Sequence, residues 1–569
     1  MASYPRALDV VTLNGQKYAI DPQFGETTYV QSPQPQFVEQ DRQVFWTSWT
    51  QRSFHNGERL PAILSKDDLE AFRYHDGEGV DVGMLSEWGE VRIQPTLTRS
   101  LAVQSATMPM AVSSDGTTLL VGLTASPYIK IWTSAAGWVS ATTLVNTSAV
   151  TDLMAVGSTF YAVQGGVPIT STNAGVTWSA LTGSHTGVVG LGYANGDVYL
   201  LKSGTGAGRV YNHTQAEDVS TITGSFIAGY RENIYWGADS RLYLYNGRSV
   251  TLYDQLPAGY IMTGLIPYRG ILFILGYYKL RTGKRNAVYY LIQGTENHLF
   301  SVGDSTTTGI MQALAGSDDE VFFANPTRGG ADRYDMTLGG VASGPATGTA
   351  MVIPFKSMAI CEGYLWVGRY DGAVGTDGIY QSDVNVPSTY LGTGWFTTPA
   401  YDFDYPNERK LFRDIRIEHA ALTIGQSITV HYSLDEGATW VQAMVSKAVG
   451  ATSGTATLSN IKANTIKLKL TLASGASAST TPVLRKTVVR AAPVTEAKWM
   501  WQLKLLILGR FGGAALFTAI KAAYSAQAQL EYIDVDESTA NVIISDCQIV
   551  RKPSKEDDYG YVVVELREV

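Results

Sequence analysis

Short hydrophobic runs with a central aromatic residue recur through the middle of the chain, each after a turn residue. The runs begin at Leu119, Phe160, Val198, Ile234, Ile271, Val321 and Tyr364, so successive starts are 41, 38, 36, 37, 50 and 43 residues apart. Blades of a β-propeller typically repeat every ~40–50 residues. One such unit cannot bury both of its faces alone, whereas radial stacking buries each face against a neighbour. The pattern predicts an about seven-bladed β-propeller over residues 106–394.

One unit of this repeat shows how many strands it contains. Alternating or apolar segments separated by turn residues are found at Phe226–Tyr230, Ile234–Gly237, Arg241–Tyr245 and Ser249–Tyr253. The pair Asn246-Gly247 between the last two is the strongest short signal for a hairpin. Four short antiparallel strands are the content of one propeller blade.

The first 105 residues lack this period. Five prolines punctuate them, and the run from Val44 to Trp49 is strongly aromatic. Residues 66–74 have a short amphipathic pattern that predicts one or two helical turns. We interpret residues 1–105 as an irregular N-terminal arm whose last part, Val91–Val103, supplies a strand that closes the propeller.

After residue 395 the spacing of the strands changes. Residues 395–495 contain six alternating segments separated by small polar turns, which predict a β-sandwich. These segments are Leu411–Ala421, Ser427–Tyr432, Trp440–Met444, Thr455–Leu458, Thr465–Leu472 and Arg485–Arg490.

Residues 496–569 follow an α+β pattern. A buried strand at Trp499–Leu508 precedes a helix over Ala514–Ala528, in which Leu516, Ile520 and Ala523 form one apolar stripe. Four more strands are expected, at Leu530–Ile533, Val542–Ile544, Gln548–Arg551 and Tyr561–Leu566. The fold class expected for the whole chain is therefore mainly β.

Charge and composition exclude several functional classes. Charged residues are 17% of the 569 residues, and 43 Lys+Arg against 51 Asp+Glu give a net charge of −8. This balance does not favour binding to a phosphate backbone, so we expect no nucleic-acid partner. The longest uncharged apolar run, Phe511–Ile520, is half of the ~20 residues of a spanning helix, so no membrane insertion is expected. We see no secretory signal, and Cys361 and Cys547 alone cannot make a disulfide framework.

The sharpest motif is an Asp-box, Ser-x-Asp-x-Gly-x-x-Trp, of the kind seen in sialidase-like propellers. Residues 433–440 match it with Ser433, Asp435, Gly437 and Trp440, and residues 171–178 match it with Ser171, Asn173, Gly175 and Trp178. In this motif Asp or Asn accepts backbone hydrogen bonds, Gly takes a positive φ and Trp packs across the turn. The motif supplies no nucleophile, so we interpret both copies as structural turns.

An Asp-box raises the alternative of a sialidase-like glycan hydrolase. The nearest string to the sialidase start, Tyr268-Arg269-Gly270-Ile271, departs from Phe/Tyr-Arg-Ile-Pro, and no arginine trio can be assigned. Glycoside hydrolysis needs two carboxylates about 5–10 Å apart, and Asp318, Asp319 and Glu320 look like hairpin-turn residues. We therefore expect no enzyme activity and no catalytic residue.

Two surface clusters have a functional and an ordinary interpretation. Lys279, Arg281, Lys284 and Arg285 could contact an anionic glycan or a neighbouring subunit, or could be a solvated hairpin tip. Likewise, the aromatic residues Phe45, Trp46, Trp49 and Phe54 could form a sugar-stacking platform, or be core or interface.

No cofactor or metal site is expected. The stretch Asp534-Val535-Asp536-Glu537 begins like a calcium loop but lacks the later Gly and Glu. The seven histidines show no zinc-binding spacing, and no Gly-rich phosphate loop follows a strand.

The organisation as a whole resembles that of tailed-bacteriophage minor tail and baseplate proteins. The resemblance rests on the aromatic arm ending in Gly79-Val80-Asp81-Val82-Gly83, and on the propeller running into Thr397–Asp402 and Tyr432–Gly437. It rests also on a C-terminal module containing Asp546–Arg551 and Tyr561–Leu566. It covers most of the chain at the level of architecture.

The resemblance implies a structural protein of the virion tail, assembled in the cytoplasm of a host bacterium. Its partners would be other phage tail proteins and further copies of itself, with contact to a host surface glycan or receptor at the tail tip. The near-neutral residues 496–569 would dock onto the tail. A receptor- or glycan-binding module and a glycan hydrolase remain the alternatives.

Overall fold

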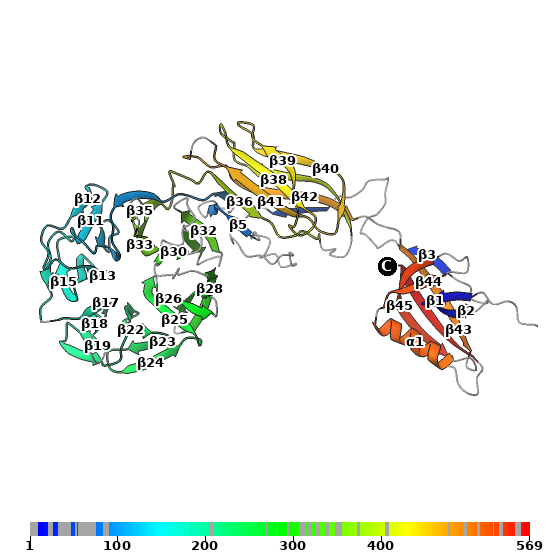
Figure 1. Ribbon diagram of the computed structural model, residues 1–569, viewed down its shortest axis with the longest axis horizontal. Coiled ribbons are helices and arrows are strands. Elements are labelled where there is room, and N and C mark those ends of the chain that lie inside the picture. The colour runs from blue at the N-terminus through cyan, green and yellow to red at the C-terminus, as the bar shows by residue number, and fades with distance from the viewer. Residues whose placement is uncertain are drawn as a thin grey trace, which may run out of the picture.

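The computed structural model describes residues 10–20, 27–31, 47–51, 54, 76–83, 90–183, 185–203, 209–268, 270–280, 283–292, 295–305, 314–316, 320–325, 330–335, 341–346, 355–372, 376–403, 409–475, 478–493, 498–508, 513–526, 528–533, 539–551 and 559–568. Over these residues the protein is mainly β, as the sequence predicted, and it contains one helix. Figure 1 shows three bodies: a ring of small sheets, a pair of larger sheets and a module with the helix.

The ring consists of seven antiparallel four-stranded sheets, the arrangement of a β-propeller. The first sheet contains β9 (Met110–Val112), β10 (Leu119–Gly122), β11 (Ile129–Thr133) and β12 (Gly137–Ser140), and the second contains β13 (Val150–Val156), β14 (Thr159–Gln164), β15 (Val167–Ser171) and β16 (Ser179–Ala180). The third sheet contains β17 (Val188–Ala194), β18 (Asp197–Lys202), β19 (Arg209–Asn212) and β20 (Glu217–Ser220). The fourth sheet contains β21 (Phe226–Tyr230), β22 (Asn233–Ala238), β23 (Arg241–Tyr245) and β24 (Val250–Gln255).

The fifth sheet has the longest strands, and the seventh takes its last strand from the N-terminal part of the chain. The fifth sheet contains β25 (Tyr260–Tyr268), β26 (Ile271–Leu280), β27 (Gly283–Ile292) and β28 (Thr295–Ser305). The sixth sheet contains β29 (Leu314–Gly316), β30 (Glu320–Asn325), β31 (Gly330–Asp335) and β32 (Val341–Ala346). The seventh sheet contains β33 (Phe355–Cys361), β34 (Tyr364–Arg369), β35 (Gly378–Asp383) and β8 (Thr98–Ala102). Each of the seven hydrophobic runs found in the sequence forms the second strand of one sheet.

Neighbouring sheets of the ring bury apolar side chains between them. Leu120 of the first sheet and Phe160 of the second share one cluster, while Leu119 of the first and Trp366 of the seventh share another. The first strands also approach closely, because β9 contacts both β13 and β33. The ring is therefore closed by packing between its first and last sheets as well as by the β8–β35 pairing.

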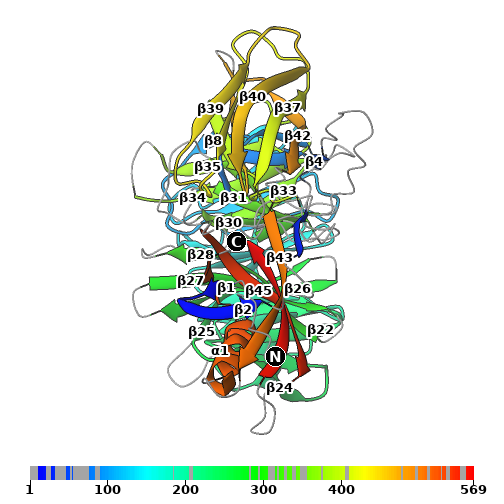
Figure 2. The same ribbon diagram turned by 90° about the vertical axis from the view of Figure 1, so that its right-hand side faces the viewer.

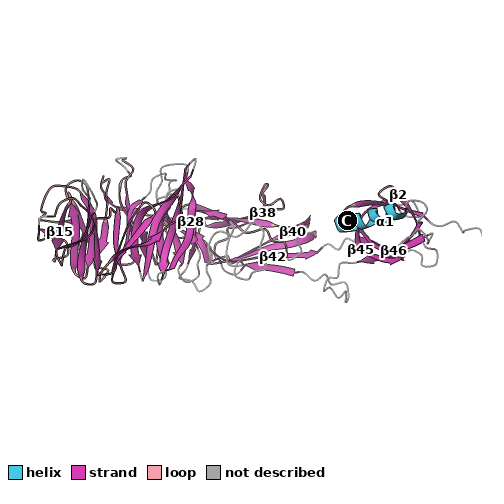
Figure 3. Cartoon of the chain, turned by 90° about the horizontal axis from the view of Figure 1, so that it is seen from below, coloured by secondary structure: helices cyan, strands magenta, loops and turns pink. Residues whose placement is uncertain are grey.

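Two larger antiparallel sheets, here called the two-sheet module, share one hydrophobic core. The five-stranded sheet runs β39 (Val441–Ser446), β38 (Ser427–Ser433), β41 (Lys467–Ala473), β36 (Thr393–Thr397) and β5 (Asp76–Glu78). The other runs β40 (Ser453–Ala463), β37 (Lys410–His419), β42 (Val483–Pro493), β7 (Glu90–Ile93) and β6 (Val80–Gly83), with β4 (Thr47–Gln51) paired to β42. In Figure 3 this module lies between the ring and the remaining body.

The third body, here called the terminal module, is built from both ends of the chain. Its order is β2 (Gln16–Ile20), β1 (Val10–Leu13), β44 (Leu530–Ile533), β45 (Thr539–Arg551), β46 (Tyr559–Glu568), β43 (Lys498–Leu508) and β3 (Thr27–Gln31). Because β2 also pairs with β43, the sheet closes on itself. Figure 2 shows β1 and β2 beside the C-terminal strands.

The helix α1 (Gly513–Ala526) packs on this closed sheet through the predicted stripe. Ile520 is 4% exposed, and Leu516 and Ala523 pack against the same core. The two short strands expected at 542–544 and 548–551 form one strand, β45, whose register shifts twice where it pairs with β46. A register shift places a residue without a partner, which interrupts the alternation that the sequence shows.

The N-terminal 105 residues differ from the single arm that their sequence suggested. Their strands are divided among all three bodies: β1–β3 join the terminal module, β4–β7 the two-sheet module, and β8 the ring. The segment expected to give a closing strand, 91–103, does so through β8, which pairs with β35 of the seventh sheet, while residues 91–93 belong to β7 of the two-sheet module. Each strand is too short to specify its partner locally, so pairing with distant strands decides its place. The expected helical turns at 66–74 lie outside the described residues.

Candidate functional site

The first Asp-box forms the turn between β15 and β16. The Ser171 hydroxyl donates to Asn173 Oδ1 at 2.9 Å and accepts the Gly175 N–H at 3.1 Å. Asn173 Oδ1 also accepts the Thr177 N–H at 3.0 Å. Trp178, 5% exposed, donates its indole N–H to the Gly175 carbonyl at 2.7 Å. Gly175 has φ +83°, and a Cβ there would lie 2.5 Å from the Leu120 side chain, so a larger residue would be strained and would displace Leu120.

This turn also joins two sheets of the ring. The Thr142 N–H donates to the Val176 carbonyl at 2.9 Å, and the Trp178 N–H donates to the Thr143 carbonyl at 3.0 Å. Residues 142 and 143 follow the last strand of the first sheet, whereas residues 176 and 178 belong to the second. The Ser171 hydroxyl and the Asn173 side chain thus shape the turn, and backbone groups of the same turn bind the neighbouring sheet.

The second Asp-box forms the turn between β38 and β39 of the two-sheet module. Ser433 donates to Asp435 at 2.6 Å and accepts the Gly437 N–H at 2.8 Å. Thr439 donates its N–H and its hydroxyl to Asp435 at 2.9 and 2.6 Å. Trp440 is half-buried, and Gly437 has φ +105°. The two copies lie in different bodies and do not form a common site.

Hydrogen bonds from Ser433 and Thr439 lower the pKa of Asp435 to about 2. Because the folded pKa lies below the unfolded value of ~3.9, this carboxylate stabilises the fold at pH values above about 4. Its contribution is lost as the pH falls through the folded pKa of about 2.

We expect Asn173→Ala to destabilise the protein by about 1 kcal/mol, because the Thr177 N–H and the Ser171 hydroxyl lose an acceptor. Asn173→Asp is the matched control and should change stability by less than about 0.5 kcal/mol, because Asp435 fills the same position of the second copy. Urea unfolding of the two variants measures the difference. Equal losses in both variants would show that the side-chain acceptor is not what stabilises this turn.

The basic cluster lies on the hairpin β26–β27 of the fifth sheet, where β26 pairs with β27 up to Leu280 and Gly283. Lys279 is exposed, and Lys284 Nζ lies 4.8 Å from the centre of the Tyr277 ring. Arg285 is placed in β27 opposite Asp304, while Arg281 lies outside the described residues. The described part of the cluster therefore presents lysines beside a tyrosine ring at one end of a long hairpin.

The proposed aromatic platform is not formed by its two described members. Phe54 is fully buried in the core of the two-sheet module, 5.4 Å from the Phe396 ring. Trp49 stacks on the Tyr401 ring at 5.2 Å, and the Tyr401 hydroxyl donates to Gln51 at 2.9 Å. These residues pack the core, which was the ordinary interpretation; Phe45 and Trp46 lie outside the described residues.

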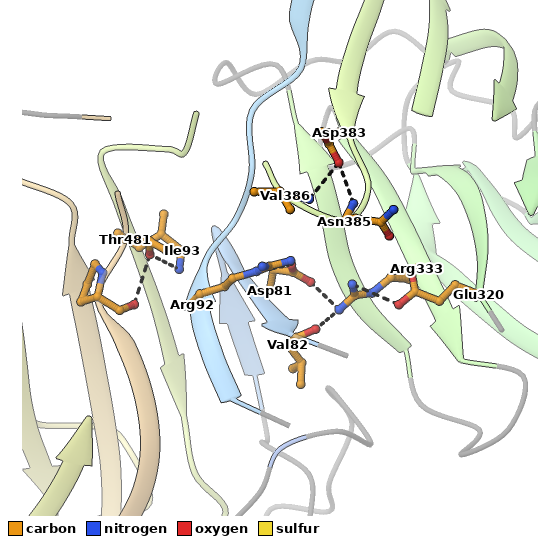
Figure 4. Close-up of polar contacts among 11 residues, drawn as sticks. Asp81, Val82, Arg92, Ile93, Glu320, Arg333, Asp383, Asn385, Val386 and Thr481 are labelled. Atoms are coloured by element: carbon orange, nitrogen blue, oxygen red, sulfur yellow. Dashed lines mark hydrogen bonds and ion pairs between the residues drawn. The ribbon is translucent and has the colours of Figure 1, made fainter. Parts of the chain in front are cut away.

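The most concentrated polar cluster was not found from the sequence: it lies at the joint between the ring and the two-sheet module (Figure 4). Arg333 of β31 is 5% exposed in its side chain and lies 2.6 Å from Asp81 of β6 and 3.3 Å from Glu320 of β30. It also donates to the Val82 carbonyl. Asp81, 2% exposed, is in turn 3.0 Å from Arg92 of β7. Two arginines and two carboxylates thus balance their charges.

Backbone pairing reinforces the same joint. The Leu97 N–H donates to the Ala346 carbonyl at 2.7 Å, and the Ala346 N–H donates to the Pro95 carbonyl at 3.0 Å. The chain leaves and re-enters the two-sheet module side by side, because Pro95 and Tyr390 form an antiparallel bridge. The Leu391 N–H donates to the Gln94 carbonyl at 3.0 Å. Both chain crossings and the buried ion cluster therefore hold the ring against the two-sheet module.

Of the three carboxylates considered for glycoside hydrolysis, only Glu320 is described. Glu320, the described member of the carboxylate candidates, is paired with Arg333; Asp318 and Asp319 lie outside the described residues. Where the chain is described, no three His, Cys, Asp or Glu side chains gather as metal ligands would. In that part, no helix is long and apolar enough to cross a membrane.

Comparison with known proteins gives only distant structural likeness. No family model and no curated protein matches the chain. A β-propeller domain of Cps50 (Swd1) from Myceliophteria thermophila aligns at 12% identity and TM-score 0.38, over 49% of this chain and 97% of that one. Virginiamycin B lyase from Staphylococcus aureus aligns at 10% identity and TM-score 0.39, over 50% and 98%.

The extracellular domain of a putative one component system from B. thetaiotaomicron aligns over more of the chain, 85% of it and 62% of the other, at 9% identity and TM-score 0.38. None of these values supports an inference about function. The description of the ring as a propeller rests on its own sheets and their pairing.

Proposed function

We propose that this chain is a structural component of the tail of a tailed bacteriophage, a minor tail, baseplate or tail-tip protein. The observation that favours this role is the nested construction of the chain. The ring is inserted into the two-sheet module, and that module is inserted between the two halves of the terminal module. Every body boundary is therefore crossed twice by the chain, which suits a part that must hold its shape within a large assembly.

In finer detail, we propose that the seven four-stranded sheets are the blades of a seven-bladed propeller. The two-sheet module is then a β-sandwich made of residues 395–495 and the N-terminal strands β4–β7. The terminal module is the α+β body that docks onto other tail proteins, completed by β1–β3. Figure 1 draws it beyond the two-sheet module, on the side away from the ring. Docking through the terminal module would leave the propeller to face a neighbouring copy or the host.

A second candidate function is binding of a host surface glycan or receptor by the propeller. It is favoured by the β26–β27 hairpin, where Lys279 is exposed and Lys284 lies over the Tyr277 ring. Lysine ammonium groups can bind an anionic group of a glycan, and a tyrosine ring can pack against a sugar face. Saturable binding of the purified protein to host cells, lost in Lys279→Ala/Lys284→Ala, would favour this function.

We expect a variant lacking residues 1–31 and 496–569 to be absent from phage particles, because it lacks all seven strands of the terminal module. Immunogold electron microscopy with antibody against the ring measures incorporation, and wild-type particles should be labelled at the tail end. The double mutant Lys279→Ala/Lys284→Ala is the control and should still be incorporated. Unlabelled wild-type particles, in a preparation whose lysate contains the protein, would overturn the structural role.

A further inference from the structure

The outer face of the five-stranded sheet in the two-sheet module carries a tryptophan ring. Phe396 of β36 is fully buried in the core of the module, so the alternation of a strand places Trp395 and Thr397 on the opposite, outer face. Trp395 is half-buried, and it pairs in register with Thr471 of β41 on one side and Glu78 of β5 on the other. Figure 1 draws these strands next to each other in the module.

A lysine of the neighbouring strand lies over this ring. Lys469 Nζ is 4.3 Å from the centre of the Trp395 ring. Lys469 pairs in register with Thr397 of β36 and with His431 of β38, so its backbone lies between these two residues. Among the described residues, its ammonium has no carboxylate partner. An ammonium held only by an aromatic ring at a half-exposed position is weakly held, so a ligand can displace it and take its place on the ring.

Two polar atoms beside this lysine are buried and have no hydrogen-bond partner in the described part of the chain. They are Oγ1 of Thr397, a residue that is 5% exposed, and Nδ1 of His431. Burial, and then the charge of Lys469, lower the pKa of His431. Its imidazole is therefore neutral at neutral pH and can donate one hydrogen bond and accept another. Buried polar groups normally have a partner, and hydroxyl groups of a ligand could supply one.

Trp440 of the second Asp-box extends the same face. Lys467 lies on the same side of β41 as Thr471, because the residues between them alternate. A Cβ at Gly437 would lie 3.3 Å from the Trp440 ring and 3.8 Å from Lys467 Nζ, so both side chains border this glycine. From Lys467 to Thr471 the strand advances about 14 Å. The two indole rings thus mark the ends of a strip that is long enough for a chain-like ligand.

The charges on this strip indicate the class of ligand. Asp76 and Glu78 of β5 are exposed, and the Asp76 carboxylate acts on Lys467. Charges of both signs do not favour a polyanion, and lysines and carboxylates are depleted in the core of protein interfaces. Sugar hydroxyls both donate and accept hydrogen bonds, so they suit such a mixed set of groups. The apolar face of a sugar ring can pack on an indole.

We propose that the strip from Trp395 to Trp440 binds an uncharged saccharide chain. A sugar ring packs on Trp395 after displacing the Lys469 ammonium, and its hydroxyls form hydrogen bonds with Thr397 and His431. The site is separate from the basic hairpin β26–β27, whose lysines suit an anionic group. It does not depend on a role in a phage tail.

A microarray of neutral and acidic glycans from microbes and animals, probed with the full chain, tests the proposal. We expect binding to neutral glycans, and Trp395→Ala should lower the affinity for a soluble form of the best-bound neutral glycan about tenfold. Arg416→Ala is the matched control, because Arg416 is 49% exposed and lies on the other sheet of the same module. This variant should bind like the wild-type protein. Isothermal titration measures the three affinities.

A wild-type protein that binds no neutral glycan on the array would overturn the proposal, and so would equal affinities of the wild type and Trp395→Ala. Binding to acidic glycans alone, lost in Lys279→Ala/Lys284→Ala, would assign recognition to the hairpin of the ring instead. Self-association that is lost in Trp395→Ala, without any glycan binding, would mean that copies of the chain meet at this face. If Trp395→Ala does not fold, Thr471→Arg decides, because it places a long side chain next to the ring and should block the sugar.

Discussion

Replacing Arg333 by methionine should destabilise the protein by about 3 kcal/mol, at the lower end of the ~3–5 kcal/mol seen when one partner of a buried ion pair is removed. The substitution leaves the buried carboxylate of Glu320 without this guanidinium and withdraws the donor from the Val82 carbonyl. Asp81 keeps Arg92 at 3.0 Å, which limits the loss. Urea unfolding measures the effect. Small-angle scattering of the variant should also show a wider range of ring orientations.

The matched control is an ion pair of the two-sheet module that is open to solvent. Arg485 lies 2.7 Å from Glu90, with 56% of the arginine side chain exposed. Exposed pairs contribute about 0–1 kcal/mol, so Arg485→Met should leave stability and scattering nearly unchanged. If Arg333→Met were equally mild, the buried cluster would not be what fixes the ring on the two-sheet module.

The parts of the fold that could be predicted are those set by neighbouring residues. Each hydrophobic run, such as Leu119–Gly122 or Tyr364–Val367, lies in a second strand whose partners follow or precede it by a short turn. The six strands expected within 410–493 also appear, with ends shifted by a few residues. Turn residues and alternation are local signals, so one sequence is enough to find them.

The parts that could not be predicted depend on contacts between distant segments. Thr12 of β1 pairs with Ile533 of β44, and Trp49 of β4 pairs with Val489 of β42. No local pattern tells a five-residue strand which of many edges it will join. The N-terminal strands could be expected as strands, but their division among three bodies could not.

The candidate sites also differ in whether the sequence alone reveals them. An Asp-box can be recognised because its serine, acid or amide, glycine and tryptophan fall within eight residues. The joint between the ring and the two-sheet module cannot be recognised in this way, because Asp81 and Arg333 are far apart along the chain and each looks like an ordinary turn or strand residue. Only the fold shows that Arg333 is buried and faces two carboxylates.

Removing the whole ring should leave the rest of the protein folded. The chain enters and leaves the ring through paired backbone: the Thr96 N–H donates to the Thr389 carbonyl at 2.9 Å, and Pro95 bridges to Tyr390. Residues 97–388 can therefore be replaced by a two-residue Asn-Gly turn, which suits adjacent antiparallel ends. We expect the shortened chain to unfold cooperatively, because the shared core of the two-sheet module contains no residue of the ring's seven sheets.

A second substitution tests the role of the joint in the same shortened chain. Asp81 would keep Arg92 but lose its contact with Arg333, so Asp81→Asn should be tolerated in the shortened chain and should be damaging in the full one. Circular dichroism and urea unfolding of the full and the shortened chain, each with and without Asp81→Asn, separate the effect of removing the ring from the effect of the substitution.

The reverse experiment, removal of residues 496–569 alone, should leave β1–β3 without their partners and yield an unstable, aggregating product, because unpaired strand edges join other chains. A soluble product with native-like unfolding would show that the terminal module does not need both ends of the chain.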